Sequence, residues 1–330
     1  MRLIRHCSEL TPEHRGSVVA LGNFDGVHLG HQAVILTAKR IAEATGRPHA
    51  VMSFEPHPRV VFNPALPPFR LTPLRVKARL IEALGIDVLL LQHFDAAFAV
   101  QTAATFVDEV LVHCFGVRHV VVGWDYVFGK GREGTGDFLQ KAGERHGFGV
   151  TVVPPAVDAE GQVYSSTRVR DYLVAGQPAE AARLLGHFWE MEGRVEHGDG
   201  RGRTLGFPTA NIALAEYQRP AFGVYAVRAG IDAGGATHWH DGVANFGRRP
   251  TIGGETELLE VHLFGLTEDL YGRHLRVALV DHLRAERKFA GLDELKTQIA
   301  ADAAQARRML STRDFPAQSG PLVPVAECRR

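Results

Sequence analysis

The chain turns from a strand into a helix within the stretch Leu21-Gly22-Asn23-Phe24-Asp25-Gly26-Val27-His28-Leu29-Gly30-His31. A short apolar run, 18–21, precedes the turn, and a helical pattern over 29–44 follows it. A strand that enters a helix through small residues directs free backbone N–H groups and the positive end of the helix dipole at one point. The stretch therefore predicts a phosphate-binding turn.

Two histidines, His28 and His31, stand three positions apart and so share one face of the first helical turn. They can donate hydrogen bonds to phosphate oxygens, and more strongly as negative charge develops there. A metal pair is the alternative interpretation, although a closed metal site needs further ligands. Two ordinary surface histidines at a helix start are another.

The pattern Gly-x-Phe-Asp-x-x-His-x-Gly-His resembles the signature of the nucleotidyltransferase superfamily, and with Asn23 and Gly26 it resembles the bacterial FAD synthetase version. The resemblance implies that His28 and His31 act in catalysis by stabilising the α-phosphate of ATP and the charge that develops on it. It also implies that the residues before them help to bind ATP, namely Gly22, Asn23, Phe24 and Asp25.

A second polar cluster, Ser165-Ser166-Thr167-Arg168-Val169-Arg170, stands where a helix is expected to begin. Hydroxyl groups, a helix dipole and guanidinium groups together suit a phosphate, although a plain capped helix with solvated arginines has the same pattern. The cluster resembles the second signature of the same nucleotidyltransferases. That resemblance implies that Ser165, Ser166, Thr167 and Arg168 bind the phosphates that leave as pyrophosphate.

The length of 330 residues predicts two domains, which we expect at 1–186 and 187–312, with a disordered tail over 313–330. Hydrophobic residues make up 45% of the chain, enough for two cores, and the formal net charge is +0. This balance argues against a broad nucleic-acid or membrane surface. The sequence has no long apolar run and no leader pattern, which predicts a cytoplasmic protein. The cysteines stand at 7, 114 and 328 with no paired spacing, which predicts no disulfide and no zinc site and fits a reducing compartment.

Apolar runs alternate with helical patterns through the first half, which predicts a Rossmann-like parallel sheet covered by helices on both faces. Ligands bind such sheets at the carboxyl ends of the strands. Two loops should reach that edge, 54–59 with Pro56 and His57, and 123–134 with Asp125 and Phe128. Prolines that flank a histidine make a stiff loop, and aromatics can stack on a flat ring, so both loops suit the wall of a pocket. The resemblance to FAD synthetases implies that these four residues contact the flavin. A plain surface turn is the alternative for 54–59.

The loop 123–134 departs from the family pattern. Related sequences commonly continue as Asp-Phe-Arg-Phe-Gly, whereas this chain has Asp125-Tyr126-Val127-Phe128-Gly129, with valine in place of the arginine. Lys130 or Arg132 is expected to supply the missing cation. The same loop contains a literal Gly-x-Gly-x-x-Gly, which is not a dinucleotide fingerprint because several residues separate it from the strand end.

The second half has strand-like runs separated by glycine-rich turns, at 187–196, 223–229, 238–245, 256–264 and 275–283. They predict an antiparallel barrel of the six-stranded type. A final helix over 292–310 should pack on it through the stripe Leu292, Leu295, Ile299, Ala303, Ala306 and Leu310.

The stretch 198–211 combines glycines and arginines with Thr209 and Asn211, whose oxygens suit a hard cation such as Mg²⁺. A hairpin turn is the commoner meaning of glycine-rich loops. However, the block Gly-Phe-Pro-Thr-Ala-Asn at 206–211 resembles the riboflavin kinase signature. The resemblance implies an ATP-binding set of Gly198, Gly200, Gly202, Arg203, Pro208, Thr209 and Asn211.

Glu260 lies on one face of an expected strand together with Leu258, His262 and Phe264. Charge alone does not select it over Glu255 or Glu257, and a strand glutamate is usually solvated. The segments 242–251, 260–272 and 284–289 resemble later blocks of riboflavin kinases. They imply that Glu260 is the general base and that Arg284 and Phe289 contact the flavin.

Four motif blocks in family order resemble those of bifunctional bacterial riboflavin kinase/FAD synthetases. The resemblance implies that riboflavin, FMN and ATP are substrates, that Mg²⁺ is a cofactor and that the protein is a monomer or a weak homo-oligomer. Two alternatives remain: another nucleotidyltransferase, for example of the pantetheine-phosphate type, with an unrelated barrel, or a flavin-binding or storage protein that has lost one or both activities.

Overall fold

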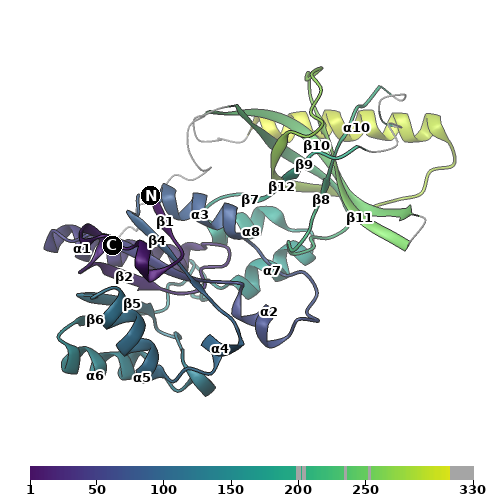
Figure 1. The fold of residues 1–330 in the computed structure, drawn as a ribbon. Coiled ribbons are helices and arrows are strands. Elements are labelled where there is room, and N and C mark those ends of the chain that lie inside the picture. The colour runs from purple at the N-terminus through teal and green to yellow at the C-terminus, as the bar shows by residue number, and fades with distance from the viewer. Residues whose placement is uncertain (198–201, 203–205, 234–235, 252–253, 313–330) are drawn as a thin grey trace. The chain divides into compact units, whose positions relative to one another are not determined.

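The computed structural model describes residues 1–197, 202, 206–233, 236–251 and 254–312 (Figure 1). The chain forms two compact units. The first contains Met1–Pro67 and Leu74–Ser165, and the second contains Pro68–Pro73 and the chain from Ser166 onward. The expected boundary at 186 differs from this division, and the expected tail from 313 lies outside the described residues.

The first unit contains the predicted parallel sheet. Its six strands have the order β1-β4-β3-β2-β5-β6, and every neighbouring pair is parallel. The strands are β1 (Arg2–Ile4), β2 (Val18–Leu21), β3 (His49–Glu55), β4 (Val88–His93), β5 (His119–Gly123) and β6 (Gly149–Val153). The edge strand β1 was not predicted, because three residues at the chain start carry too little pattern.

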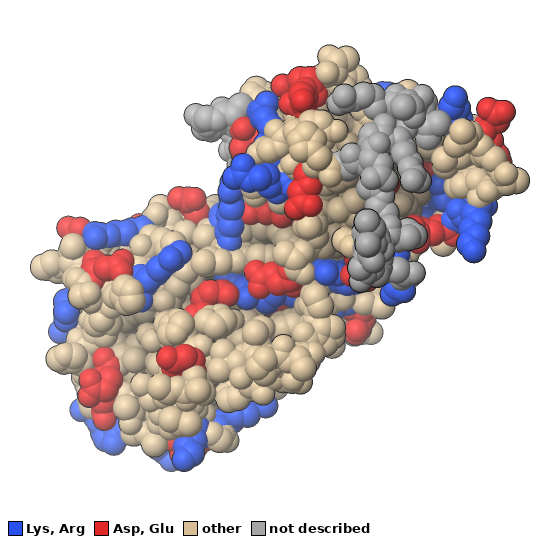
Figure 2. All heavy atoms as spheres, turned by 45° about the vertical axis from the view of Figure 1, so that its right-hand side comes forward, with Lys and Arg blue, Asp and Glu red and all other residues tan. Residues whose placement is uncertain are grey.

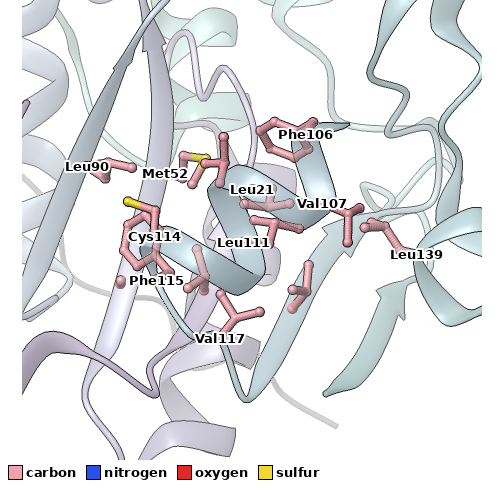
Figure 3. Close-up of a cluster of buried hydrophobic side chains, with 14 of the residues drawn as sticks. Leu21, Met52, Leu90, Phe106, Val107, Leu111, Cys114, Phe115, Val117 and Leu139 are labelled. Carbon is pink, nitrogen blue, oxygen red and sulfur yellow. The ribbon is translucent and has the colours of Figure 1, made fainter. Parts of the chain in front are cut away.

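The helices of the first unit follow the predicted alternation. They are α1 (Leu29–Thr45), α2 (Pro58–Phe62), α3 (Leu74–Ala83), α4 (Ala96–Ala99), α5 (Ala103–Thr105), the π-helix η3 (Phe106–Cys114) and α6 (Gly136–His146), with short 3₁₀ turns η1 (Cys7–Glu9), η2 (Pro12–His14) and η4 (Lys130–Arg132). Figure 3 shows side chains of η3 against Leu21, Met52 and Leu90 of the sheet. Burial of this apolar face is what fixes the helix on the sheet.

The prediction that the chain has no disulfide is wrong. Cys7 in η1 and Cys114 at the end of η3 are bonded, with their Cα atoms 5.6 Å apart. The two residues are separated by 107 positions in the sequence. Such a pairing depends on which elements lie side by side in the fold, so spacing along the chain does not reveal it.

The second unit contains a curled antiparallel sheet of six strands in the order β7-β12-β9-β10-β11-β8. The strands are β7 (Trp189–Arg194), β8 (Ala210–Ala213), β9 (Gly223–Ala233), β10 (Ala236–Thr251), β11 (Gly254–Leu263) and β12 (His274–Arg284). Glu196, just after β7, pairs with Asn211 of β8, which links the two outer strands of the sheet. This confirms the predicted barrel, but β8 was missed because its residues were assigned to the glycine-rich loop.

The described residues of this unit form the helices α7 (Ser166–Val174), α8 (Pro178–Leu185) and α10 (Leu292–Ser311). On α10, Ala306 and Leu310 pack into a core with residues of β9, β10 and β12. The predicted stripe is wrong at its first position, because Leu292 is 65% exposed. Buried Asp302 was not predicted on that face.

The segment Pro68–Pro73 packs within the second unit although the chain on both sides of it belongs to the first. Arg70 forms a parallel bridge with Tyr217, and the backbone N–H of Arg70 donates to the carbonyl of Glu216 at 3.1 Å. The indole N–H of fully buried Trp189 donates to the Leu71 carbonyl at 2.8 Å. The second unit therefore includes a part of the chain that lies far upstream in sequence.

Charged side chains of both signs are interspersed over the face of the molecule in Figure 2. This matches the formal net charge of +0. Among the described residues, no helix is both long enough and apolar enough to span a lipid bilayer.

Candidate functional sites

The histidine turn between β2 and α1 is built on unusual backbone angles. Phe24 and Val27 have positive φ angles of 50° and 44°, and Gly26 has 93°. Phe24 is buried, and a Cβ atom at Gly22 would lie 2.8 Å from its ring. Position 22 therefore requires glycine, because any larger residue would clash with the Phe24 ring that folds back over the backbone.

His28 caps the start of α1, and its Nδ1 accepts a hydrogen bond from the backbone N–H of His31 at 3.3 Å. This bond places the proton of a neutral His28 ring on Nε2, which becomes the donor. The rings of His28 and His31 are stacked with centroids 3.6 Å apart. The structure thus brings the two predicted histidines together, with His28 buried at 5% exposure.

The predicted ATP residues of the turn lie around these histidines. Asp25 is 3% exposed, and the Asn23 carbonyl accepts from the Ser53 hydroxyl at 3.0 Å. The chain leading to Ser165 passes beside the turn, because a Cβ atom at Gly30 would lie 3.4 Å from Cβ of Tyr164.

Helix α7 begins at Ser166, as the second polar cluster predicts. It belongs to the second unit, whereas Ser165 and the histidine turn belong to the first. The Nε of Arg170 donates to the Phe69 carbonyl at 2.9 Å, and its guanidinium lies over the Phe69 ring. This arginine of the cluster therefore holds the 68–73 segment.

The first unit has a cavity of about 700 Å³ near the histidine turn. Asn23 lines it, together with aromatic residues of β3, of α2, of the 94–98 region, of η3 and of the 126–128 loop. The aromatic lining residues are Phe54, Phe62, Phe94, Phe98, Phe106, Tyr126 and Phe128. Three cations from two segments complete the lining: Arg59 of α2, and Lys130 and Arg132 of η4. The size and the lining suit a flat aromatic ligand with a charged end.

Only one of the four predicted flavin contacts of the first unit lines this cavity. Phe128 lines it, whereas Pro56, His57 and Asp125 do not. His57 instead caps α2, with its Nδ1 accepting from the Arg59 N–H at 3.2 Å. The loop 54–59 contributes through Pro58 and Arg59, which follow the predicted pair.

The second unit has a cavity of about 410 Å³ that collects most of the described kinase-like residues. Strand register places Glu260 of β11 directly between Asn211 of β8 and Asn245 of β10. All three line the cavity, together with Thr209. Glu257 is different, because it forms an ion pair with Arg219 at 2.6 Å and does not line the cavity. The structure therefore separates two glutamates that charge alone does not distinguish.

Asn211 has an unsatisfied polar atom. Its side chain is buried, and Oδ1 has no hydrogen-bond partner within the described part of the chain. A buried acceptor without a donor is costly unless a ligand completes it. An oxygen donor of this kind, next to Thr209 in the same cavity, fits a hard divalent cation.

The glycine-rich loop is only partly described. Gly202 and Pro208 line the cavity, whereas Gly198, Gly200 and Arg203 lie outside the described residues. A Cβ atom at Gly202 would lie 2.4 Å from the Phe207 carbonyl oxygen, so this position requires glycine.

The predicted flavin contacts of the second unit, Arg284 and Phe289, both line the cavity. Arg284 forms a two-pronged ion pair with Asp302 of α10, with Nε and Nη2 at 3.0 Å and 2.8 Å from Oδ2. At the start of the same helix, Glu294 accepts from Arg287 at 3.0 Å and from the Ala290 N–H at 2.9 Å. The segment 284–290 is therefore tied to α10 by Glu294 and Asp302. Sequence reasoning missed both residues, because their spacing of eight along the helix is a weak signal.

A family model described as FAD synthetase matches residues 10–168, and one described as riboflavin kinase matches residues 185–310. The bifunctional riboflavin kinase/FMN adenylyltransferase of Escherichia coli K12 is 44% identical over 308 residues, which cover 93% of this chain and 97% of the relative. The protein of the same name from Bacillus subtilis 168 is 40% identical over 319 residues, with the same shares of 93% and 97%.

A crystal structure from Streptococcus pneumoniae, described as a macrolide-efflux protein, superposes with a TM-score of 0.82 at 32% identity and covers 95% of this chain and 99% of its own. That likeness extends over both units of the fold. The two family models and the extent of identity with the curated relatives agree with the motifs and the two cavities. The chain belongs to the family of bifunctional riboflavin kinase/FMN adenylyltransferases, with an FAD synthetase domain followed by a riboflavin kinase domain.

Proposed function

We propose that this chain converts riboflavin to FMN in the cavity of the second unit and FMN to FAD in the cavity of the first, using ATP in both reactions. The observation that carries the assignment is the presence of two separate cavities, each beside one signature. Asn23 of the histidine turn lines the first, and Glu260 with Asn211 lines the second.

In the kinase reaction, Glu260 accepts the proton of the ribityl 5′-hydroxyl as its oxygen bonds to the γ-phosphorus of ATP. The bond between the γ-phosphorus and the bridging oxygen breaks, and ADP leaves. Asn211 and Asn245 flank Glu260 on the neighbouring strands, and all three residues line the cavity. The segment around Arg284 and Phe289 contacts the flavin ring.

Thr209 and Asn211 would hold Mg²⁺ through their side-chain oxygens, and the orphaned Oδ1 of Asn211 supports this. When bound, the cation neutralises the phosphate charge that builds up during transfer. The remaining ATP contacts come from the predicted loop with Gly202 and Pro208.

In the adenylyltransferase reaction, a phosphate oxygen of FMN attacks the α-phosphorus of ATP, and pyrophosphate leaves. The attacking phosphate is already ionised, so the site mainly has to align the two reactants and stabilise charge. His28 donates from Nε2 to the α-phosphate, with His31 stacked beside it. Ser166, Thr167 and Arg168 bind the departing pyrophosphate.

The test is incubation of the purified protein with riboflavin, ATP and Mg²⁺, followed by separation of the flavins by chromatography. FMN should form first and FAD second. Bound but unchanged riboflavin would support a storage protein, and FMN without FAD would refute the assignment of the first cavity.

We further propose a cytoplasmic monomer or weak homo-oligomer with small-molecule partners only. Sedimentation at several protein concentrations tests the oligomeric state. Free-thiol titration of protein taken directly from the cytoplasm tests the location, because the Cys7–Cys114 bond is expected to be reduced there.

A further inference from the structure

Two polar side-chain atoms are buried without a partner on residues that line the aromatic cavity of the first unit. They are Oη of Tyr126 and Oε1 of Gln101, and both residues line the cavity. Neither atom has a hydrogen-bond partner in the part of the chain that the structure describes. Buried polar atoms are nearly always paired, so each of these points to a group that is supplied from outside the chain.

The Tyr126 hydroxyl is a feature of this chain. The family pattern that the loop resembles has phenylalanine at this position, so packing alone would be served without the oxygen. Burial raises the pKa of Tyr126, and the phenol therefore stays protonated and can donate a hydrogen bond.

Gln101 and Tyr126 lie on segments that the backbone holds together. The N–H of Lys130 donates to the Gln101 carbonyl at 2.8 Å, and the Tyr126 ring is stacked on Phe128 with centroids 5.7 Å apart. Phe128 in turn packs on Phe106. Gln101 and Tyr126 therefore belong to one wall of the cavity, beside its aromatic residues.

A flavin ring system has the matching chemistry. One end is an apolar dimethylbenzene ring, and the other is a pyrimidine edge with two carbonyl acceptors and one N3–H donor. The Tyr126 hydroxyl can donate to a carbonyl, and the Gln101 side-chain oxygen can accept from N3–H. The aromatic lining suits the rest of the ring.

We propose that Tyr126 and Gln101 are specificity-determining residues of the adenylyltransferase site, which bind the pyrimidine edge of FMN through its carbonyl and its N3–H. This inference rests on the proposed entry of FMN into the cavity of the first unit. A site that pairs a substrate N–H rejects an analogue that lacks it, because the buried acceptor is then left unpaired.

The test uses the full-length chain with the variants Tyr126→Phe and Gln101→Met, assayed with FMN and with N3-methyl-FMN. Each variant should raise the KM for FMN about tenfold with little change in kcat. The wild type should discriminate against N3-methyl-FMN by about tenfold or more, and Gln101→Met should remove most of that difference while Tyr126→Phe keeps it. Riboflavin kinase activity of the same preparations shows that the chain is folded.

A second pair of variants separates this inference from the assignment of the cavity. Ala99 lines the cavity, whereas Ala97 of the same helix is exposed and does not. Ala99→Trp should abolish FAD formation and Ala97→Trp should leave it unchanged. An active Ala99→Trp variant would refute the flavin site itself and the inference with it.

An inactive Ala99→Trp variant combined with an unchanged KM for FMN in both Tyr126→Phe and Gln101→Met would overturn only the inference. Equal use of FMN and N3-methyl-FMN by the wild type would overturn the role of Gln101. An effect of one substitution alone would assign the contact to that residue and refute it for the other.

Discussion

The histidine turn and the barrel cavity both bind phosphates in our proposal, but they are constructed differently. The turn is one continuous stretch whose shape follows from local features, including Gly22 under the Phe24 ring and the His28 cap on α1. The barrel cavity is assembled from β8, β10, β11, the 284–289 segment and α10. A local motif sets its own geometry, whereas an assembled site depends on strand register and on side chains that hold distant segments.

The largest effect that separates the two sites should come from Glu260→Gln. Removing a general base costs about 10²–10⁴-fold in rate, so FMN formation should fall by that factor while conversion of added FMN to FAD persists. Initial rates of both reactions on one preparation measure this. Glu257→Gln is the matched control, because Glu257 pairs with Arg219 and lies outside the cavity. Equal loss of both activities in a folded Glu260→Gln variant would contradict the two-site assignment.

The converse change is His28→Ala. It removes a donor to the α-phosphate together with the acceptor for the His31 N–H, so FAD formation should fall about 10²–10³-fold and kinase activity should remain. The exposed His93 of the same unit gives the control His93→Ala, which should leave both rates unchanged. Retention of FAD formation by His28→Ala would show that the turn is not the reacting centre.

A third comparison uses the metal requirement. Asn211→Leu removes the orphaned oxygen, so the Mg²⁺ concentration for half-maximal kinase rate should rise about tenfold. The Mg²⁺ concentration for half-maximal FAD formation should stay the same, because that reaction is proposed for the first unit and Asn211 lies in the second. A kinase titration curve that coincides with that of the wild type would remove Asn211 from the metal site.

A smaller effect is expected from Asp302→Asn, which breaks the tie between Arg284 and α10. The KM for riboflavin should rise several-fold, with less change in the KM for ATP. Thermal unfolding of the second unit should also begin earlier, since removal of one partner of a buried ion pair costs about 3 kcal/mol or more. Asp293→Asn, at an exposed position of the same helix, is the control. Identical shifts in both KM values would make Asp302 a structural residue only.

The smallest effect concerns pH. Burial lowers the pKa of His119 from its ordinary value of 6.5, so the unfolded chain binds a proton at a higher pH than the folded one. The contribution of neutral His119 to the free energy of unfolding should therefore be fully present above pH 6.5. It should decline as the pH falls from there through the lower pKa of the folded state. Urea unfolding of the first unit between pH 7 and pH 5, with His119→Gln for comparison, measures the difference. If the free energy of unfolding of His119→Gln depended on pH as steeply as that of the wild type, His119 would not be the residue responsible.

The parts of the fold that were predicted share a strong local signal. Buried apolar strands, helical stripes such as that of η3, and the signature at α1 follow from residues close together in sequence. The Cys7–Cys114 bond, the Arg284–Asp302 pair and the strand β8 depend on distant partners, and sequence periodicity carries no information about these. The same limit explains why Glu260 could be chosen by resemblance but not by charge.

The contact between Leu71 and Trp189 has a consequence for how such a chain can be divided into fragments. The kinase half is interleaved with the other half rather than appended to it, because the backbone passes between the units at 67/68, 73/74 and 165/166. Cutting the chain once, near 165, would not release either half. A gene fragment that starts at 187 would encode a barrel whose Trp189 indole has lost the carbonyl to which it donates.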